Sequence, residues 1–179
     1  MRDLSLHILD IAENSINAGA DKILIRIKED VPKDILMIEV RDNGKGMDKE
    51  TLLNASDPFF STKKVRGNIG LGIPLLKQMA EECGGKVEIE TGEGIGTSIT
   101  ASFRHGHIDR KPLGDIGSTI STLIYCHPAI NFRYEHDRDG DIYSLDTEEL
   151  REELGDVPLN STEVIKFIKN SINSWLNNT

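Results

Sequence analysis

The sequence predicts a mixed α/β domain whose sheet is at least partly antiparallel. Residues 3–20 carry apolar side chains at helical spacing, which predicts a mostly buried helix. Residues 22–29 and 35–41 instead alternate apolar and polar side chains, which predicts two half-buried strands. Because only a short turn containing Pro32 separates these strands, we expect them to form an antiparallel hairpin.

Helices and strands continue to alternate along the rest of the chain. The pattern predicts helices over 48–56 and 73–83 and strands over 86–91 and 98–103. Residues 105–117 are interpreted as a linker or loop between a core, 1–104, and a C-terminal extension, 118–179. In this part of the chain we expect a helix near 116–126, a hairpin of strands 130–136 and 141–145, and helices over 147–154 and from 161 or 162 to about 176. The apolar stripe of the last helix fits either core packing or a homodimer interface.

The composition is that of an ordinary globular protein and argues against several functions. The chain has 179 residues, of which 37% are hydrophobic and 28% charged, so it can bury a core. Its net charge of −9 argues against general nucleic-acid binding. No run of 18 apolar residues and no signal-peptide pattern is present, so we expect no membrane span and a cytoplasmic protein. Cys83 and Cys126 are interpreted as free core thiols.

Four polar side chains share one face of the first predicted helix. Asp10, Glu13, Asn14 and Asn17 follow the spacing i, i+3, i+4, i+7. A solvated helix face would explain them, but buried acids and amides need a ligand, a metal or one another. Asn14 is a neutral ligand suited to Mg²⁺, which keeps several of its waters. Asp10 lies one turn earlier and could orient a water or hydroxyl and accept its proton.

Two glycine-containing segments add to this pattern. In residues 42–47, Asp42 could accept a hydrogen bond from the exocyclic amine of a purine. Gly44 and Gly46 would let a flat ring approach the backbone. Residues 67–72, GNIGLG, precede a helix and are suited to phosphate. Each segment alone could be an ordinary turn, and neither is a Walker P-loop or a dinucleotide fingerprint.

The order of these motifs resembles the GHKL superfamily of ATP-binding domains, which includes gyrase, heat-shock chaperones, histidine kinases and MutL. DIAENSINAGA, at 10–20, is similar to the N-box of MutL proteins. DNGKGM, at 42–47, resembles the first glycine box of the superfamily. Two further segments are similar to histidine kinases: DPFFSTKK at 57–64, an F-box-like loop, and GNIGLGIPLLKQMAEECGG at 67–85, a second glycine box. GIGT, at 94–97, resembles a third glycine box, and the likeness covers residues 4–104. The implied fold is the Bergerat type, an α+β two-layer sandwich with helices on one face of a mixed, mostly antiparallel sheet.

The resemblance implies a site for ATP and Mg²⁺. Asn14 would be the Mg²⁺ ligand, Asp42 would recognise the adenine amino group, and Asp10 would occupy the catalytic position. Lys63 or Lys64 could reach a phosphate, although solvation explains either lysine equally well. The cofactor-binding residues that this likeness implies are Asn14, Asn17, Asp42, Gly44, Gly46, Met47, Lys63, Asn68, Gly70, Leu71, Gly72 and Thr97.

The sequence departs from the superfamily in ways that bear on function. Asp10 stands where hydrolysing members carry glutamate, so its carboxylate reaches about 1.5 Å less far. No phosphoacceptor hairpin is expected before the N-box, and His7 is interpreted as a packing or capping residue. The arginine-glycine-glutamate motif of MutL is missing, yet HPAINFRYEH, at 127–136, resembles the strand after the MutL ATPase core.

Three functions remain open at this point. The first is a stand-alone histidine-kinase-like domain that transfers phosphate to, or signals to, a separate protein partner. The others are a slow ATPase of the MutL type and a non-catalytic ATP sensor.

Overall fold

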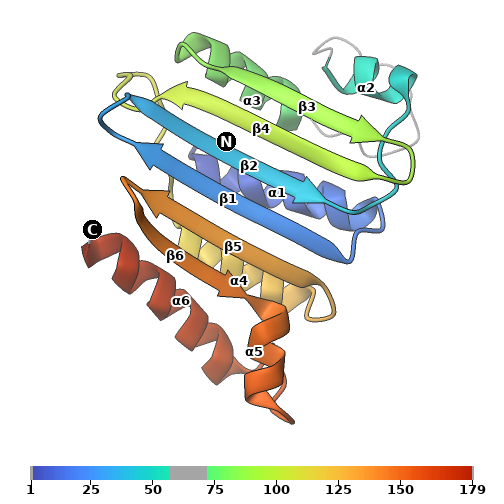
Figure 1. Ribbon diagram of the computed structural model, residues 1–179, viewed down its shortest axis with the longest axis vertical. Coiled ribbons are helices and arrows are strands. Elements are labelled where there is room, and N and C mark those ends of the chain that lie inside the picture. The colour runs from blue at the N-terminus through green and yellow to red at the C-terminus, as the bar shows by residue number, and fades with distance from the viewer. Residues whose placement is uncertain (1, 57–71, 179) are drawn as a thin grey trace.

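The computed structural model describes residues 2–56 and 72–178, which fold into a sheet with helices packed on one face (Figure 1). The strands are β1 (Lys22–Asp30), β2 (Ile35–Asp42), β3 (Lys86–Gly92), β4 (Gly96–Arg104), β5 (Asn131–Arg138) and β6 (Asp141–Asp146). The helices are α1 (Leu4–Asn17), α2 (Lys49–Ser56), α3 (Gly72–Glu82), α4 (Ile116–Cys126), α5 (Thr147–Leu154) and α6 (Thr162–Asn178). The six described strands lie in the order β3-β4-β2-β1-β5-β6.

The sheet is mixed and mostly antiparallel, as predicted. Among its neighbouring strands, only β1 and β5 run parallel to each other. This parallel contact places residues 131–138 beside residues 22–29, so the C-terminal part of the chain extends the sheet of the N-terminal part. The predicted two-layer sandwich is therefore confirmed, whereas a domain boundary at 105–117 stays a prediction.

Helix α1 begins and ends where its capping residues require. Asp3 precedes it, and Asp3 Oδ1 accepts a hydrogen bond from the backbone N–H of Leu6 at 3.1 Å. Gly19 follows its end with φ of +81°, a conformation that glycine adopts without steric cost. Between these points Ile8 and Ile11 are buried against the sheet layer. The apolar face of α1 therefore packs on the sheet, and its polar side chains lie on the remaining face.

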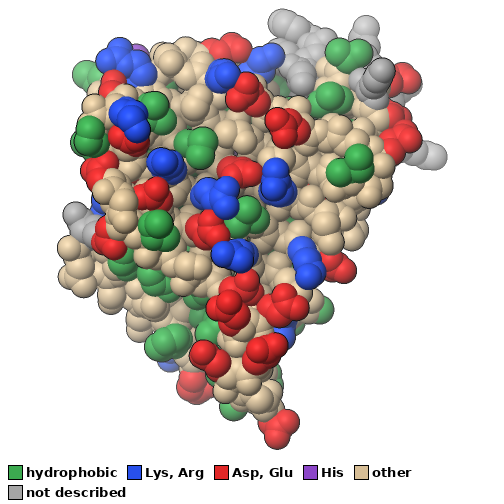
Figure 2. Space-filling view, viewed as in Figure 1, with side chains coloured by type: hydrophobic (Ala, Val, Ile, Leu, Met, Phe, Trp, Pro, Cys, Tyr) green, Lys and Arg blue, Asp and Glu red, His purple; other side chains and the backbone are tan. Residues whose placement is uncertain are grey.

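The strands turn one set of side chains toward the helices and the other toward solvent. The helix-facing set is apolar and buried, which supplies the main favourable free energy of folding. In the central and flanking strands it comprises Ile23, Ile25, Ile27, Leu36, Ile38, Val40, Ile99, Ala101, Phe103, Phe132 and Tyr134. The other side of the sheet, called here the open face, shows many charged side chains of both signs (Figure 2).

The C-terminal part of the chain packs as a continuation of the helical layer. Helix α4 packs against both α1 and α6. On α6, Val164, Ile168 and Ile172 are buried, whereas Phe167 is 65% exposed. The prediction that this stripe packs in the core is confirmed for the three buried residues, and the homodimer stays a prediction.

A polar cluster is buried at the far end of β1. Glu29 is 7% exposed, and its Oε1 accepts hydrogen bonds from His136 Nε2 at 2.9 Å and Arg138 Nε at 3.0 Å. Its Oε2 lies 3.1 Å from His105 Nε2. Burial opposes ionisation of Glu29, but these hydrogen bonds outweigh it and lower its pKa to about 2. The Tyr134 hydroxyl completes the cluster, 2.8 Å from His136 Nδ1.

The two cysteines differ in their surroundings. Both are free thiols, as predicted. Cys83 is buried, but Cys126 is exposed at the end of α4, so the prediction that it lies in the core is wrong. Leu123 and Ile124 are buried on α4, whereas Tyr125 and Cys126, at its last turn, are exposed. No helix in the described part of the chain is long and apolar enough to cross a membrane.

Candidate nucleotide-binding site

Asp42, at the end of β2, is held in place by three hydrogen bonds. Its Oδ2 accepts from the Ser15 hydroxyl of α1 at 2.6 Å. Its Oδ1 accepts from the backbone N–H of Gly44 at 2.9 Å and of Thr97 at 3.2 Å. A carboxylate offers about four lone-pair positions, so Asp42 can accept one more donor such as an amine. The side chain is half-buried, which leaves that position accessible.

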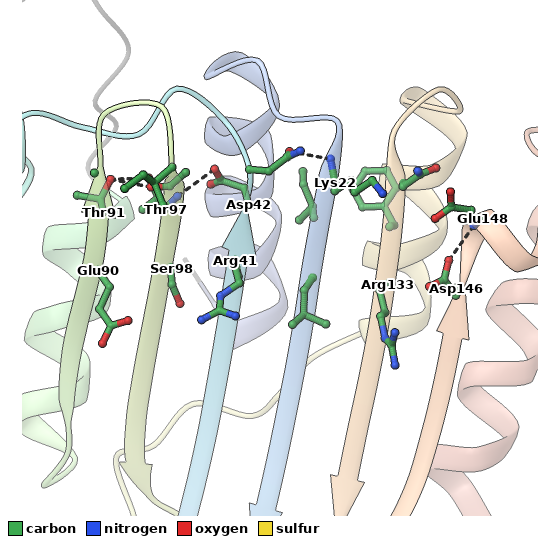
Figure 3. A pocket seen from close by; sticks show the side chains of 18 residues that line it. Lys22, Arg41, Asp42, Glu90, Thr91, Thr97, Ser98, Arg133, Asp146 and Glu148 are labelled. Carbon is green, nitrogen blue, oxygen red and sulfur yellow. Dashed lines mark hydrogen bonds between the residues drawn. The ribbon is translucent and has the colours of Figure 1, made fainter.

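Two threonines at the neighbouring strand ends support this arrangement (Figure 3). Thr91 Oγ1 donates to the carbonyl oxygen of Gly96 at 3.0 Å and accepts from the backbone N–H of Met47 at 2.9 Å. Thr91 Oγ1 also lies 3.0 Å from Thr97 Oγ1. Because the single proton of Thr91 goes to Gly96, Thr97 must donate in this pair. The lone pairs of the Thr97 hydroxyl therefore stay free to accept from a ligand.

The glycines of residues 42–47 are required by close packing of three segments. Gly46 has φ of +68°, and a Cβ there would lie 1.9 Å from the carbonyl oxygen of Gly92. At Gly44 a Cβ would lie 3.0 Å from the carbonyl oxygen of Ala18. The backbone N–H of Lys45 donates to that same Ala18 oxygen at 3.0 Å. These contacts hold the loop against the end of α1.

The polar stripe of α1 faces the start of α3. Asn14 Nδ2 and Asp10 Oδ2 are 3.4 Å apart, and both side chains are half-buried. A Cβ on Gly72 would lie 1.8 Å from Asp10 Oδ2, so Asp10 packs directly on the first residue of α3. Burial raises the pKa of Asp10, with the Asn14 hydrogen bond opposing it, which makes Asp10 a stronger base than an exposed aspartate.

The other polar residues of α1 have structural partners or are exposed. Glu13 Oε1 lies 3.0 Å from His127 Nε2, which links α1 to the end of α4. His7 is buried near the backbone of Gly72, and burial lowers its pKa. The expectation that His7 is a packing residue is thus confirmed. Asn17 is exposed at the end of α1.

The structure brings most of the described candidate residues to one end of the molecule. Asp42, Gly44 and Thr97 are joined by direct hydrogen bonds, and Ser15 ties them to α1. The predicted residues Lys63, Asn68, Gly70 and Leu71, with the alternative Lys64, lie outside the described residues.

Two members of this arrangement, Ser15 and Thr91, were not predicted from the sequence. Ser15 is a hydroxyl on the buried side of α1, in line with Ile8 and Ile11, and that departure from an apolar stripe could have identified it. Thr91 offers no such signal, because it reads as an ordinary strand residue.

The described residues offer no complete metal site of their own. No group of three or more His, Cys, Asp or Glu side chains among them could hold a metal ion. Asn14 turns its amide nitrogen toward the Asp10 carboxylate, so its amide oxygen is not used in this contact and can bind a metal ion. This fits Mg²⁺ bound mainly through waters and substrate phosphates, which is the usual mode for Mg²⁺ in nucleotide sites.

Comparison with known proteins matches this geometry. Residues 2–107 match the family described as histidine kinase-, DNA gyrase B- and HSP90-like ATPase. The chain belongs to this family. It is therefore an ATP-binding domain of the GHKL type, and the resemblance to that superfamily is confirmed.

The relatives with similar sequences are sensor kinases. Sporulation kinase E of Bacillus subtilis is 33% identical over 107 residues, which is 58% of this chain and 14% of that protein. Sensor histidine kinase YvrG of Bacillus subtilis is 28% identical over 94 residues, which is 51% of this chain and 16% of that protein. The chain thus spans about a sixth of the length of these relatives.

A solved structure extends the likeness of the fold. The Aquifex aeolicus MutL ATPase domain, complexed with ADP, superposes with a TM-score of 0.50 and 17% identity. The match covers 86% of this chain and 68% of that one. Residues 2–107 alone could not supply this coverage, so the shared fold includes much of the C-terminal part of the chain.

Proposed function

We propose that this domain binds Mg·ATP and transfers the γ-phosphoryl group to a separate protein. The observation that carries the proposal is Asp42, which is fixed by Ser15, Gly44 and Thr97 and keeps one acceptor position for the adenine amine. Asn14 would be the protein ligand of Mg²⁺, which would neutralise phosphate charge during transfer. Kinase chemistry is favoured by the similarity to sensor kinases.

Asp10 is the residue proposed to act on the acceptor. Its raised pKa suits a general base that takes the proton of the attacking hydroxyl or imidazole. The acceptor atom forms a bond to the γ-phosphorus as the bond to ADP breaks, and Asp10 receives the proton. The direct contact with Gly72 fixes the carboxylate, so it does not need to be ordered during the reaction.

Two alternatives each rest on one observation. A slow ATPase is favoured by the likeness to the MutL domain, which is complexed with ADP and whose fold includes the C-terminal part of this chain. A non-catalytic ATP sensor is favoured by the short side chain of Asp10. For all three functions we propose a cytoplasmic site of action and a protein partner that is not yet identified.

Incubation with γ-labelled ATP, with and without protein extracts as acceptors, distinguishes these functions. A kinase transfers label to protein, an ATPase releases labelled phosphate without an acceptor, and a sensor does neither while still binding ATP. In the first two cases Asp10→Asn should abolish turnover and leave ATP binding intact. If Asp10→Asn changes neither label transfer nor phosphate release, Asp10 is not the base.

A further inference from the structure

The open face of the sheet carries a continuous chain of five alternating charges. Arg26 is at its centre and donates from Nε to Glu135 at 2.8 Å and from Nη1 to Glu39 at 2.8 Å. Arg133 Nε donates to Glu135 at 2.8 Å, and Arg41 Nε lies 3.8 Å from Glu39. The chain therefore begins and ends with an arginine, and its net charge is positive on a protein of net charge −9.

Both terminal arginines line a groove of about 760 Å³ that covers the strand ends and the adjoining part of the open face (Figure 3). Arg41 and Arg133 occupy the positions on either side of Leu24, on the strands that flank β1. Their side chains are 60% and 56% exposed. Arg41 makes no hydrogen bond to any described residue, and Arg133 uses only Nε. A guanidinium has five N–H donors, so both arginines can bind a carboxylate.

The charges along the groove form a simple pattern. The strand register places Glu90, Ser98, Arg41, Leu24, Arg133 and Asp146 in one row across the six strands. Reading across the sheet, the row runs negative, neutral, positive, neutral, positive, negative. Five strand spacings make it about 24 Å long, which an extended peptide of about seven residues would span. The groove is therefore suited to a ligand with negative charge in the middle and positive charge at its ends.

This pattern disfavours two other occupants. If a second copy docked the same row in reverse, Glu90 would face Asp146, Arg41 would face Leu24 and Arg133 would face Ser98. Both charge–charge contacts would then join like charges, and no arginine would meet a carboxylate. A polyanion such as a nucleic acid would meet Glu90 and Asp146 at the two ends of the row. Neither objection applies to a peptide of mixed charge. Its basic ends can lie against Glu90 and Asp146 while its acidic centre lies between the arginines.

We propose that this groove binds an extended segment of a protein partner that crosses the strands. An acidic side chain of the segment lies between Arg41 and Arg133, and basic side chains lie near Glu90 and Asp146. Arg41 and Arg133 are on the sheet face opposite α1, so binding between them does not depend on the proposed catalytic activity. Asp42 and Thr97 line the rim of the groove and are left unchanged in the test.

The test is titration of the full chain with labelled synthetic peptides at low ionic strength, followed by fluorescence anisotropy. The matched peptide is capped, with a central glutamate, a lysine four positions before it and a lysine three positions after it. The reversed peptide exchanges every lysine and glutamate. We expect the matched peptide to bind about tenfold more tightly or better than the reversed one, and this difference to shrink with salt.

Two double variants locate the site. Arg41→Gln with Arg133→Gln should weaken the matched peptide about tenfold. Lys28→Gln with Lys86→Gln removes the same charge from the same face outside the groove and should change affinity less than about twofold. Equal binding of the two peptides, or equal loss in the two double variants, would overturn the proposal.

The remaining outcomes are also decisive. If the arginine variant fails to fold by circular dichroism, the two peptides on the unmodified protein decide alone. If the unmodified protein self-associates in sedimentation and the arginine variant does not, the groove belongs to a second copy and the proposal is wrong.

Discussion

Two polar clusters at opposite ends of the sheet differ in how completely they are hydrogen-bonded. At the far end of β1, Glu29 receives donors on both oxygens from His136, Arg138 and His105. On α1, Asp10 and Asn14 have only their mutual 3.4 Å contact among the described side chains. Both clusters are at least half removed from solvent. Among the described residues, the second cluster therefore makes fewer hydrogen bonds than the first.

The difference indicates what each cluster is for. A satisfied buried network stabilises the fold, whereas an under-bonded one costs free energy that ligand binding can offset. Glu29 joins β1 to β5 and to the loop after β4, and so connects the N-terminal and C-terminal parts of the sheet. Among the described residues, the side chains of Asp10 and Asn14 have no hydrogen-bond partner beyond each other, which is the property expected of a binding site.

The largest predicted effect is on stability. Glu29→Gln should lower the free energy of unfolding at neutral pH by about 3 kcal/mol, since folding lowers the Glu29 pKa from 4.5 to about 2. Because the folded-state pKa is the lower one, this stabilisation is present above pH 4.5 and is lost as the pH falls toward 2. Urea unfolding at pH 7 and pH 3 measures it.

The matched control for Glu29 is Glu88→Gln, a change at a carboxylate that is 58% exposed on the same sheet. Its unfolding free energy should differ from the unmodified protein by less than about 1 kcal/mol. ATP affinity should be unchanged in both variants. A Glu29→Gln protein as stable as the control would show that the cluster contributes nothing.

A middle-sized effect is predicted for Asn14, on binding rather than on stability. Asn14→Ala should weaken ATP binding about tenfold or more when Mg²⁺ is present, and little when it is absent. Its unfolding free energy should change by less than about 1 kcal/mol, because the long contact to Asp10 is all it loses. Asn170→Ala, at an exposed position of α6, is the control for the helical substitution. Equal loss of affinity with and without Mg²⁺ would argue against a metal ligand.

The smallest predicted effect has the opposite sign. Burial raises the pKa of Asp10, so its ionised form disfavours folding, and stability is lost as the pH rises through that pKa. Asp10→Asn should therefore raise the free energy of unfolding at pH 7, by less than about 1 kcal/mol. Thermal melting across pH 4–7 would test this in a few measurements. A clear loss of stability would mean that the carboxylate has a structural role.

Much of the fold could be predicted from the sequence because it follows from local patterns. The alternation in residues 22–29 and 35–41 correctly predicts β1 and β2, and the helical spacing in residues 3–20 correctly predicts α1. The sequence could not show that β5 pairs with β1, because the pairing depends on residues more than 100 positions apart. Periodicity also misplaced Cys126, since the last turn of a helix need not keep the buried face of the turns before it.

The site was predictable in its motifs but not in its supporting contacts. Asp42 stands out because it ends a buried strand before two glycines, whereas Ser15 looks like any helical serine. The reason for Gly46 also differs from the one expected. The sequence suggests room for a flat ring, and the structure adds a close approach to Gly92 that any side chain would block.

The most direct test of the central claim is calorimetric titration of Mg·ATP into the unmodified protein and into Asp42→Asn. Asp141→Asn, an exposed aspartate on β6, is the control, and circular dichroism confirms that all three proteins fold alike. We expect saturable binding to one site in the unmodified and control proteins and an affinity about tenfold lower or worse in Asp42→Asn. Equal affinity in all three proteins, or no binding at millimolar Mg·ATP, would contradict the account.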